Sequence, residues 1–180
     1  MLPARSCPLP SECLLARHCE GLPGAYTDAF VATVPATVSL PQFVEAFYSS
    51  VAFKPELIFV GLLFGRPWAF RARELAQGRV EDFSAWRVEA RTADELLLRE
   101  IISDRTRSWL KVEPLPDGTT RLYFGSAILP VGLKADGEPR MSPLFALVGL
   151  HRVYARVLLA AAKRGLRMTR LQSVGNTQAP

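Results

Sequence analysis

The feature that most constrains the fold of this chain is a segment predicted to form a β-hairpin. Its turn determines which side chains share a face of the sheet. Two runs of alternating residues, 105–114 and 119–130, flank the tripeptide Pro-Asp-Gly at 116–118. Proline presets φ, aspartate suits the next position, and glycine readily takes a positive φ, which together are typical of a three-residue loop. Closing that loop pairs Leu115 with Thr119 and sets the register of the whole hairpin.

This register divides the hairpin into two different faces. One face holds an ion pair and an aromatic ring opposite a glycine, in the pairs Glu113–Arg121, Lys111–Tyr123, Trp109–Gly125 and Arg107–Ala127. The other face is apolar near the turn and hydroxylated farther away, in the pairs Val112–Leu122, Leu110–Phe124, Ser108–Ser126 and Thr106–Ile128. An inner face of this kind predicts a lined cavity as well as a packed core, because ligand pockets combine apolar walls with a few polar groups.

The remaining elements follow from periodicity and capping signals. We expect a strand over 26–34, a helix from Ser39 to about Ser50, an apolar segment over 55–64, and a polar helix that ends near Gln77. Strands over about 85–91 and 95–102 lead into the hairpin. A long helix then runs from Ser142 to about Lys163 and stops at Gly165.

This order of elements predicts the fold class. Consecutive strands joined by short turns pair as antiparallel neighbours, and a long helix must bury its apolar stripe against one face of the sheet. We therefore expect an α+β fold in which a curved antiparallel sheet grips the C-terminal helix, with two helices inserted after the first strand. Residues 25–165 would form a single domain, residues 1–24 a flexible tail, and residues 166–180 a C-terminal tail.

The register of the strand before the hairpin has two solutions. A two-residue turn at Ser103-Asp104 turns Arg99 inward opposite Ser108, whereas a three-residue turn puts Glu100 inside. We favour the first, although the chemistry of a Ser-Asp turn leaves both open. A buried Arg99 needs a partner. That partner would be Glu95 on the same strand face, or the anionic head group of a ligand.

The long helix carries a histidine beside its apolar stripe, which consists of Leu147, Leu150, Tyr154, Leu158 and Ala161. His151 has two interpretations. It is either a partly buried side chain with a structural hydrogen bond, or a polar contact or acid/base group in the cavity. Tyr154 is likewise either a core aromatic or a second hydroxyl in the same region.

The candidate ligand-binding residues are the inner-face side chains that these elements bring together: Arg99, Thr106, Ser108, Leu110, Phe124, Ser126, Leu147, His151 and Tyr154. Catalytic motifs are sparse, with neither a P-loop nor a dinucleotide-binding glycine turn. A Ser126–His151 pair has no evident third group, so we assign no catalytic residue unless His151 acts as an acid or base.

Composition narrows the classes of partner. The net charge of +5 comes from scattered residues, only four of them lysines, so we expect no nucleic-acid partner. Cys7, Cys13 and Cys19 have a spacing that fits no zinc pattern, so we expect free thiols, no metal and no cofactor. Without a signal-peptide pattern or a membrane-length apolar run, we expect a cytoplasmic protein with no transmembrane segment. The sequence does not indicate an oligomeric state.

Over roughly residues 26–165 the chain resembles the START-like, helix-grip superfamily of polyketide cyclase and lipid-transfer-like proteins. More narrowly, it is similar to a bacterial family of uncharacterised proteins within that superfamily. The resemblance lies in Asp-Glu-Leu-Leu-Leu at 94–98, the strands at 105–112 and 121–130, and Leu-His-Arg-Val-Tyr at 150–154. It implies a hydrophobic cavity between the sheet and the last helix, and no tightly bound cofactor.

Fold alone does not choose among functions, because such proteins include both carriers and enzymes. The first hypothesis is a module that binds a small hydrophobic or amphipathic molecule, such as a carboxylate with an apolar tail held by Arg99. The alternative is a cyclase- or hydratase-like enzyme that uses His151 as acid/base on an enclosed polyketide-like substrate. A third is a partner-binding or membrane-surface protein that uses residues 57–64, if these are exposed.

Overall fold

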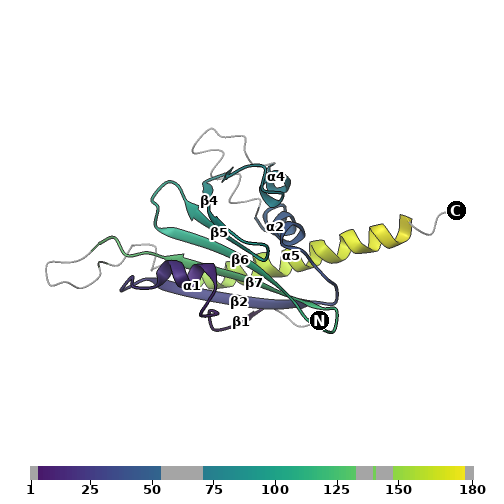
Figure 1. Cartoon of the computed structure of the whole chain (residues 1–180), viewed down its shortest axis with the longest axis horizontal. Helices are drawn as coiled ribbons and strands as arrows, with labels where there is room; N and C mark the ends of the chain where they lie inside the picture. Colours follow the sequence, from purple (N-terminus) through teal and green to yellow (C-terminus); the bar gives the residue numbers. More distant parts are fainter. Residues whose placement is uncertain (1–3, 54–70, 133–139, 141–147, 177–180) are drawn as a thin grey trace.

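The computed structural model of the chain describes residues 4–53, 71–132, 140 and 148–176, and Figure 1 shows their arrangement. Within these residues the helices are α1 (Leu14–Cys19), α2 (Leu40–Tyr48), α4 (Ala72–Ala76) and α5 (Val148–Asn176). The strands are β1 (Arg5–Ser6), β2 (Tyr26–Val34), β3 (Asp82–Phe83), β4 (Trp86–Arg91), β5 (Glu95–Glu100), β6 (Thr106–Pro114) and β7 (Thr120–Ile128). The expected apolar segment over 55–64 lies outside the described residues.

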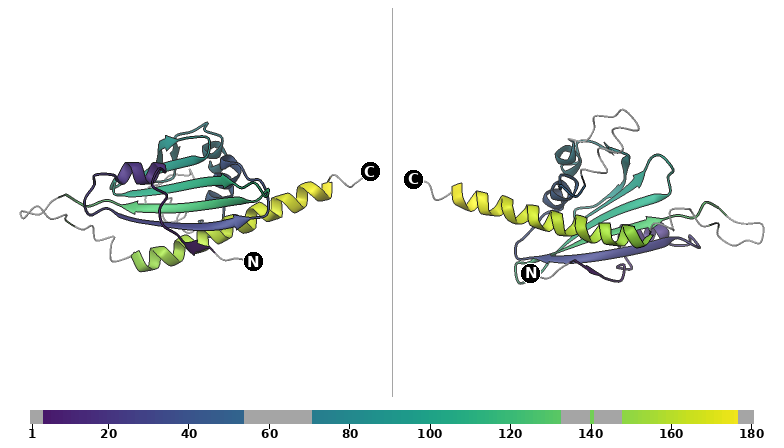
Figure 2. Two further views of the ribbon diagram at one scale, coloured as in Figure 1. Left: turned by 60° about the horizontal axis from the view of Figure 1, so that its bottom comes forward. Right: turned by 180° about the vertical axis from the view of Figure 1, so that it is seen from behind.

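The described strands form one antiparallel sheet in the order β1-β2-β7-β6-β5-β4-β3. The sheet is curved, and α2 and α5 lie on its inner face, α2 along the centre and α5 across β2 and β7 (Figures 1 and 2). The prediction of an α+β, helix-grip arrangement, with two helices after the strand at 26–34, is confirmed. The short β3 lies between the predicted polar helix and the strand expected over about 85–91.

The register of the β6–β7 hairpin is as predicted from its turn. Every predicted pair from Thr106–Ile128 to Glu113–Arg121 is observed. The Leu115 backbone N–H donates to the Thr119 carbonyl at 2.8 Å, and Gly118 has a φ of 76°. Glycine at this position therefore supplies the positive φ that the loop requires.

The favoured register of β5 against β6 is wrong by one residue. Leu98, rather than Arg99, lies opposite Ser108, and Arg99 lies opposite Arg107. Arg99 is therefore on the outer face of the sheet, where its guanidinium lies 3.5 Å from Asp104 and its side chain is 35% exposed. The predicted anion contact inside the fold is thereby excluded.

The loop between β5 and β6 explains this outcome. Asp104 takes a positive φ of 57°, a conformation that aspartate tolerates better than most residues. The Glu100 carboxylate accepts hydrogen bonds from the Ser103 backbone N–H at 2.9 and 3.0 Å. These features stabilise the longer loop, so the alternative register is the correct one.

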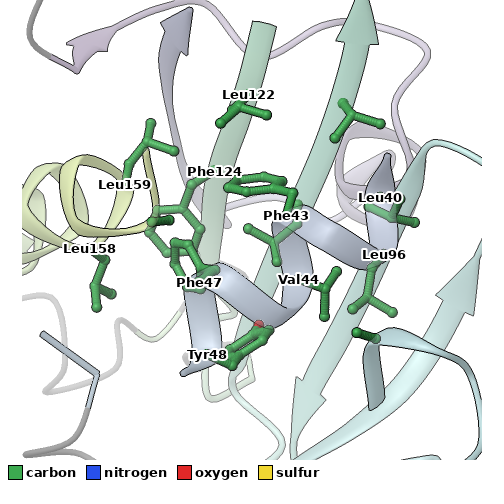
Figure 3. Packing of buried hydrophobic residues seen from close by; sticks show 14 of the residues in the cluster. Leu40, Phe43, Val44, Phe47, Tyr48, Leu96, Leu122, Phe124, Leu158 and Leu159 are labelled. Carbon is green, nitrogen blue, oxygen red and sulfur yellow. The ribbon is translucent and has the colours of Figure 1, made fainter. Parts of the chain in front are cut away.

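The main core lies between the inner face of the sheet and α2, with α5 beside them. Ser39 caps α2 in a capping box with Gln42, and Pro occupies its first turn, as the sequence predicts. Figure 3 shows the buried residues of α2 and α5 pointing towards β5 and β7. The fully or nearly fully buried side chains labelled there are Leu40, Phe43, Val44, Phe47, Tyr48, Leu96, Leu122, Phe124, Leu158 and Leu159.

The outer face of the sheet is covered by the N-terminal segment. Strand β1 pairs with β2, and α1 lies over Trp109, which is 0% exposed. The buried Glu95 carboxylate accepts hydrogen bonds from the Leu14 backbone N–H and from Trp109 Nε1, each at 2.7 Å, and lies 2.9 Å from Lys111 Nζ. The expectation of a flexible tail is therefore wrong for residues 4–24, and Glu95 is not a partner of Arg99.

Helix α5 continues through Gly165 to Asn176, so the expectation of a tail from residue 166 is wrong as far as residue 176. Gly165 packs instead against α2, where an added Cβ would lie 4.0 Å from the Ala46 Cβ. The last part of α5 extends beyond the edge of the sheet (Figure 2).

Docking of α1 predicts different reactivities for the three free cysteines. Burial raises the pKa of all three thiols, but Cys13 is only 1% exposed, whereas Cys7 and Cys19 are half-buried. Because alkylation requires the reagent to reach the thiolate, we expect Cys13 to be alkylated by iodoacetamide about tenfold more slowly than the other two. Peptide mass spectrometry of time points checks this, with urea-unfolded protein as the control. Equal rates in the folded protein would mean that α1 is not docked.

Candidate functional site

Three polar side chains from distant parts of the chain meet beside α5. Ser126 on β7 lies opposite Asp28 on β2, and its hydroxyl donates to Asp28 Oδ1 at 2.6 Å. His151, near the start of α5, places Nε2 at 2.7 Å from Ser126 Oγ and at 4.0 Å from Asp28 Oδ2. We call Asp28, Ser126 and His151 the polar cluster.

The hydrogen bonds of the polar cluster determine the tautomer of neutral His151. The only proton of the Ser126 hydroxyl is donated to Asp28, so Ser126 Oγ accepts from His151. Nε2 therefore carries the proton, and Nδ1 is left as an acceptor or a base. Ser126 is not arranged as a nucleophile, because its base would have to accept its proton rather than donate one.

A row of polar groups extends from the polar cluster along the inner face. The Tyr26 hydroxyl donates to Asp28 Oδ2 at 3.2 Å, and burial together with the charge of Asp28 raises the pKa of Tyr26. Ser108 lies opposite Ser126, and its hydroxyl is 3.0 Å from the hydroxyl of Tyr48 on α2. The hydroxylated end predicted from the hairpin is therefore present.

Exposure within this row differs sharply from group to group. Ser126 is 2% exposed, Ser108 is 5% exposed, and the Asp28 side chain is 7% exposed. The His151 side chain is 28% exposed. A molecule that approaches the row would therefore meet His151 first, with the buried carboxylate and hydroxyls behind it.

The structure brings together only part of the predicted ligand-binding set. Ser126 and His151 are in contact, Ser108 is their neighbour, and Thr106 lies one inner-face pair farther along β6. Leu110 and Phe124 belong to the packed core, at 0% and 4% exposed.

Two predicted residues lie elsewhere. Arg99 lies on the outer face, and the Tyr154 hydroxyl donates to the Ala52 carbonyl at 3.3 Å, in keeping with a core aromatic whose hydroxyl is satisfied. Leu147 lies outside the described residues.

Asp28 is the member of the polar cluster that sequence reasoning missed. Its signal was the alternation of the strand at 26–34, in which Tyr26, Asp28, Phe30, Ala32 and Val34 share a face. An aspartate on the inward face of such a strand indicates a buried carboxylate with partners. Those partners become identifiable only once β2 is paired with β7.

Metal and membrane features were searched within the described ranges. There, no group of three His, Cys, Asp or Glu side chains is placed to hold a metal ion. In the same part of the chain, no helix combines the length and apolarity needed to cross a membrane.

Comparisons with known proteins add little to this geometry. No protein-family model matches the chain, and no curated protein matches it. Among solved structures, the conjugative relaxase TrwC in complex with oriT DNA, in a metal-bound form, is similar at 17% identity with a TM-score of 0.24. The match covers 83% of this chain and 44% of the relaxase chain. At that TM-score the similarity supports no conclusion about fold or activity.

Proposed function

We propose that this protein binds a small hydrophobic molecule bearing a hydroxyl group, with the hydroxyl donating to His151 Nδ1. The observation that carries the proposal is the 2.7 Å contact between His151 and Ser126, which orients a partly exposed imidazole with its basic nitrogen unused by Ser126. The partly buried ring of Tyr154, one turn farther along α5, would contact the rest of the ligand. The resemblance to START-like proteins agrees with this proposal, and a cytoplasmic location stays an expectation.

The charge of the polar cluster favours a neutral ligand over a carboxylate. Asp28 is buried behind His151, and Arg99, the cation expected to hold an anion, lies on the other face of the sheet. A carboxylate at this position would face the like charge of Asp28, whereas a hydroxyl supplies the donor that Nδ1 lacks.

The test compares 2-naphthol with 2-naphthoate, two probes with the same ring system, by isothermal titration calorimetry. We expect the His151→Phe substitution to weaken 2-naphthol binding about tenfold, the loss that corresponds to one hydrogen bond of ~1.4 kcal/mol. Tyr154→Phe is the matched control, because that hydroxyl is bonded to Ala52 and should not affect the affinity. Equal 2-naphthol affinities for wild type and His151→Phe would contradict the proposal. Native mass spectrometry of freshly purified protein would identify any ligand that co-purifies.

A cyclase- or hydratase-like enzyme remains the second candidate, since an imidazole oriented by Ser126 and Asp28 is also suited to general-base catalysis. Its signature would be proton abstraction next to a carbonyl. We would incubate 2-tetralone with the protein in D₂O and follow deuterium incorporation by NMR. The enzyme hypothesis requires exchange faster than in buffer and loss of the acceleration in His151→Phe. Exchange at the buffer rate would contradict the enzyme hypothesis and favour the binding module.

A further inference from the structure

A concave site lies on the opposite side of α2 from the sheet. It is a groove of about 1020 Å³ between α2, the loop over 36–38 and α5. Its floor consists of small or aliphatic side chains and a glycine backbone: Ala36, Val38, Ala46, Ala161, Gly165 and Leu166. The polar cluster is not part of this groove, so an inference about the ligand of the groove does not depend on the function proposed above.

The loop wall of the groove is held in place from the buried side. Thr120, which is 0% exposed, donates through its hydroxyl to the Ala36 carbonyl at 2.7 Å and accepts from the Val38 backbone N–H at 3.1 Å. The floor includes the contact of α2 with α5 around Ala46 and Gly165. The groove therefore has a defined wall and a defined floor before any ligand binds, which lowers the entropic cost of binding.

Among the described residues, the charged groups along the groove leave one cation without an ion-pair partner. Glu45 is already bonded to Arg73, with 2.9 Å between Oε1 and Nε. Arg164 is exposed and, among the described residues, takes part in none of the ion pairs that involve the groove. The net charge of these three side chains is therefore positive, and a guanidinium is well suited to hold a carboxylate through two parallel hydrogen bonds.

A second observation that suggests a ligand in the groove is the unsatisfied hydroxyl of Ser50, at the end of α2. It lines the groove and is 9% exposed, yet its hydroxyl oxygen is buried and has no hydrogen-bond partner in the described part of the chain. Buried hydroxyls are normally satisfied, and an unsatisfied one in a ligand site is explained when the ligand completes it.

From this combination we infer that the groove binds a free amphipathic carboxylate. The carboxylate pairs with Arg164, Ser50 turns its hydroxyl into the groove to donate a second hydrogen bond, and the apolar chain lies over Ala46, Ala161 and Gly165. The volume is sufficient for an acyl chain of medium length.

The test uses decanoate and 1-decanol below the concentrations at which they aggregate, with calorimetric titration of the full chain. We expect decanoate to bind about tenfold more tightly than decanol, in line with one charge-assisted contact. Arg164→Gln should remove this difference and leave decanol binding unchanged, whereas Gly165→Leu, which fills the floor, should weaken both. Arg79→Gln, an exposed charge change away from the groove, is the control.

Ser50→Ala separates a ligand contact from a structural role. Removal of an unsatisfied buried hydroxyl should raise the melting temperature of the empty protein, while decanoate affinity falls severalfold. A lower melting temperature with unchanged affinity would overturn the role of Ser50. Equal affinities of wild type for decanoate and decanol, or full decanoate binding by Arg164→Gln, would overturn the carboxylate site itself.

Discussion

Replacement of Glu95 by alanine is expected to destabilise the protein by about 3 to 5 kcal/mol, the range for breaking a buried ion pair by removing one partner. Glu95 is 4% exposed, and one of its oxygens accepts from both the Leu14 backbone N–H and Trp109 Nε1. The substitution would leave two donors unpaired, and Lys111 would lose its closest carboxylate. Urea denaturation followed by circular dichroism measures the loss.

Two comparisons make this prediction specific. Glu113→Ala removes a carboxylate from the same face of the sheet, but that group is partly exposed beside Arg121 and Tyr123, so its loss should cost less than the loss of Glu95. Glu95→Gln keeps one oxygen acceptor and removes the charge, so its effect should lie between the other two. A loss for Glu95→Ala no larger than that for Glu113→Ala would contradict the importance of this contact.

The same substitution should release the N-terminal segment before the whole domain unfolds. Glu95 is the side chain that holds the first backbone N–H of α1, and Arg17 on this helix is exposed. We therefore expect faster trypsin cleavage after Arg17 in Glu95→Ala under conditions where the sheet stays folded, since proteolysis reports local opening.

The parts of the fold that the sequence predicted are those governed by local chemistry. The β6–β7 register followed from the turn at 116–118, where glycine takes the positive φ. The neighbouring turn gave no such signal, because the positive φ there falls on Asp104 and the loop is stabilised by Glu100. Arg99 was consequently assigned to the wrong face of the sheet.

Contacts between distant segments account for what the sequence did not reveal. Helix α1 has only six residues, too few for periodicity to identify, and its docking depends on a bond between Leu14 and Glu95, 81 positions apart. Asp28 and Ser126 are 98 positions apart and become neighbours only through the pairing of β2 with β7. His151 and Ser126 were predicted as site residues, but their buried third partner required the sheet order.

Gly125→Ala is the second substitution with a large expected effect, about 3 kcal/mol of destabilisation, at the upper end for overpacking a core by one methyl group. The new Cβ would lie 2.8 Å from Trp109 Cε3, 2.9 Å from the Asp28 carbonyl oxygen and 3.2 Å from Leu15 Cδ2. The Trp109 ring lies in a filled core and the Asp28 carbonyl belongs to a paired strand, so neither group can move easily to relieve the clash. Gly149→Ala on α5, with no heavy atom within 4 Å, is the control and should be neutral or slightly stabilising.

A double-mutant cycle with Trp109→Phe can separate the two clashes. The smaller ring removes the contact at Cε3 but not the one with the Asp28 carbonyl, so we expect only partial recovery of the free energy of unfolding. The remaining cost would displace β2 at Asp28, the residue that accepts the hydrogen bond from the Ser126 hydroxyl. The His151 imidazole resonances should therefore shift in Gly125→Ala although the substitution lies on the opposite face of the sheet. Unchanged resonances, or complete recovery by Trp109→Phe, would show that the clash is absorbed on the outer face alone.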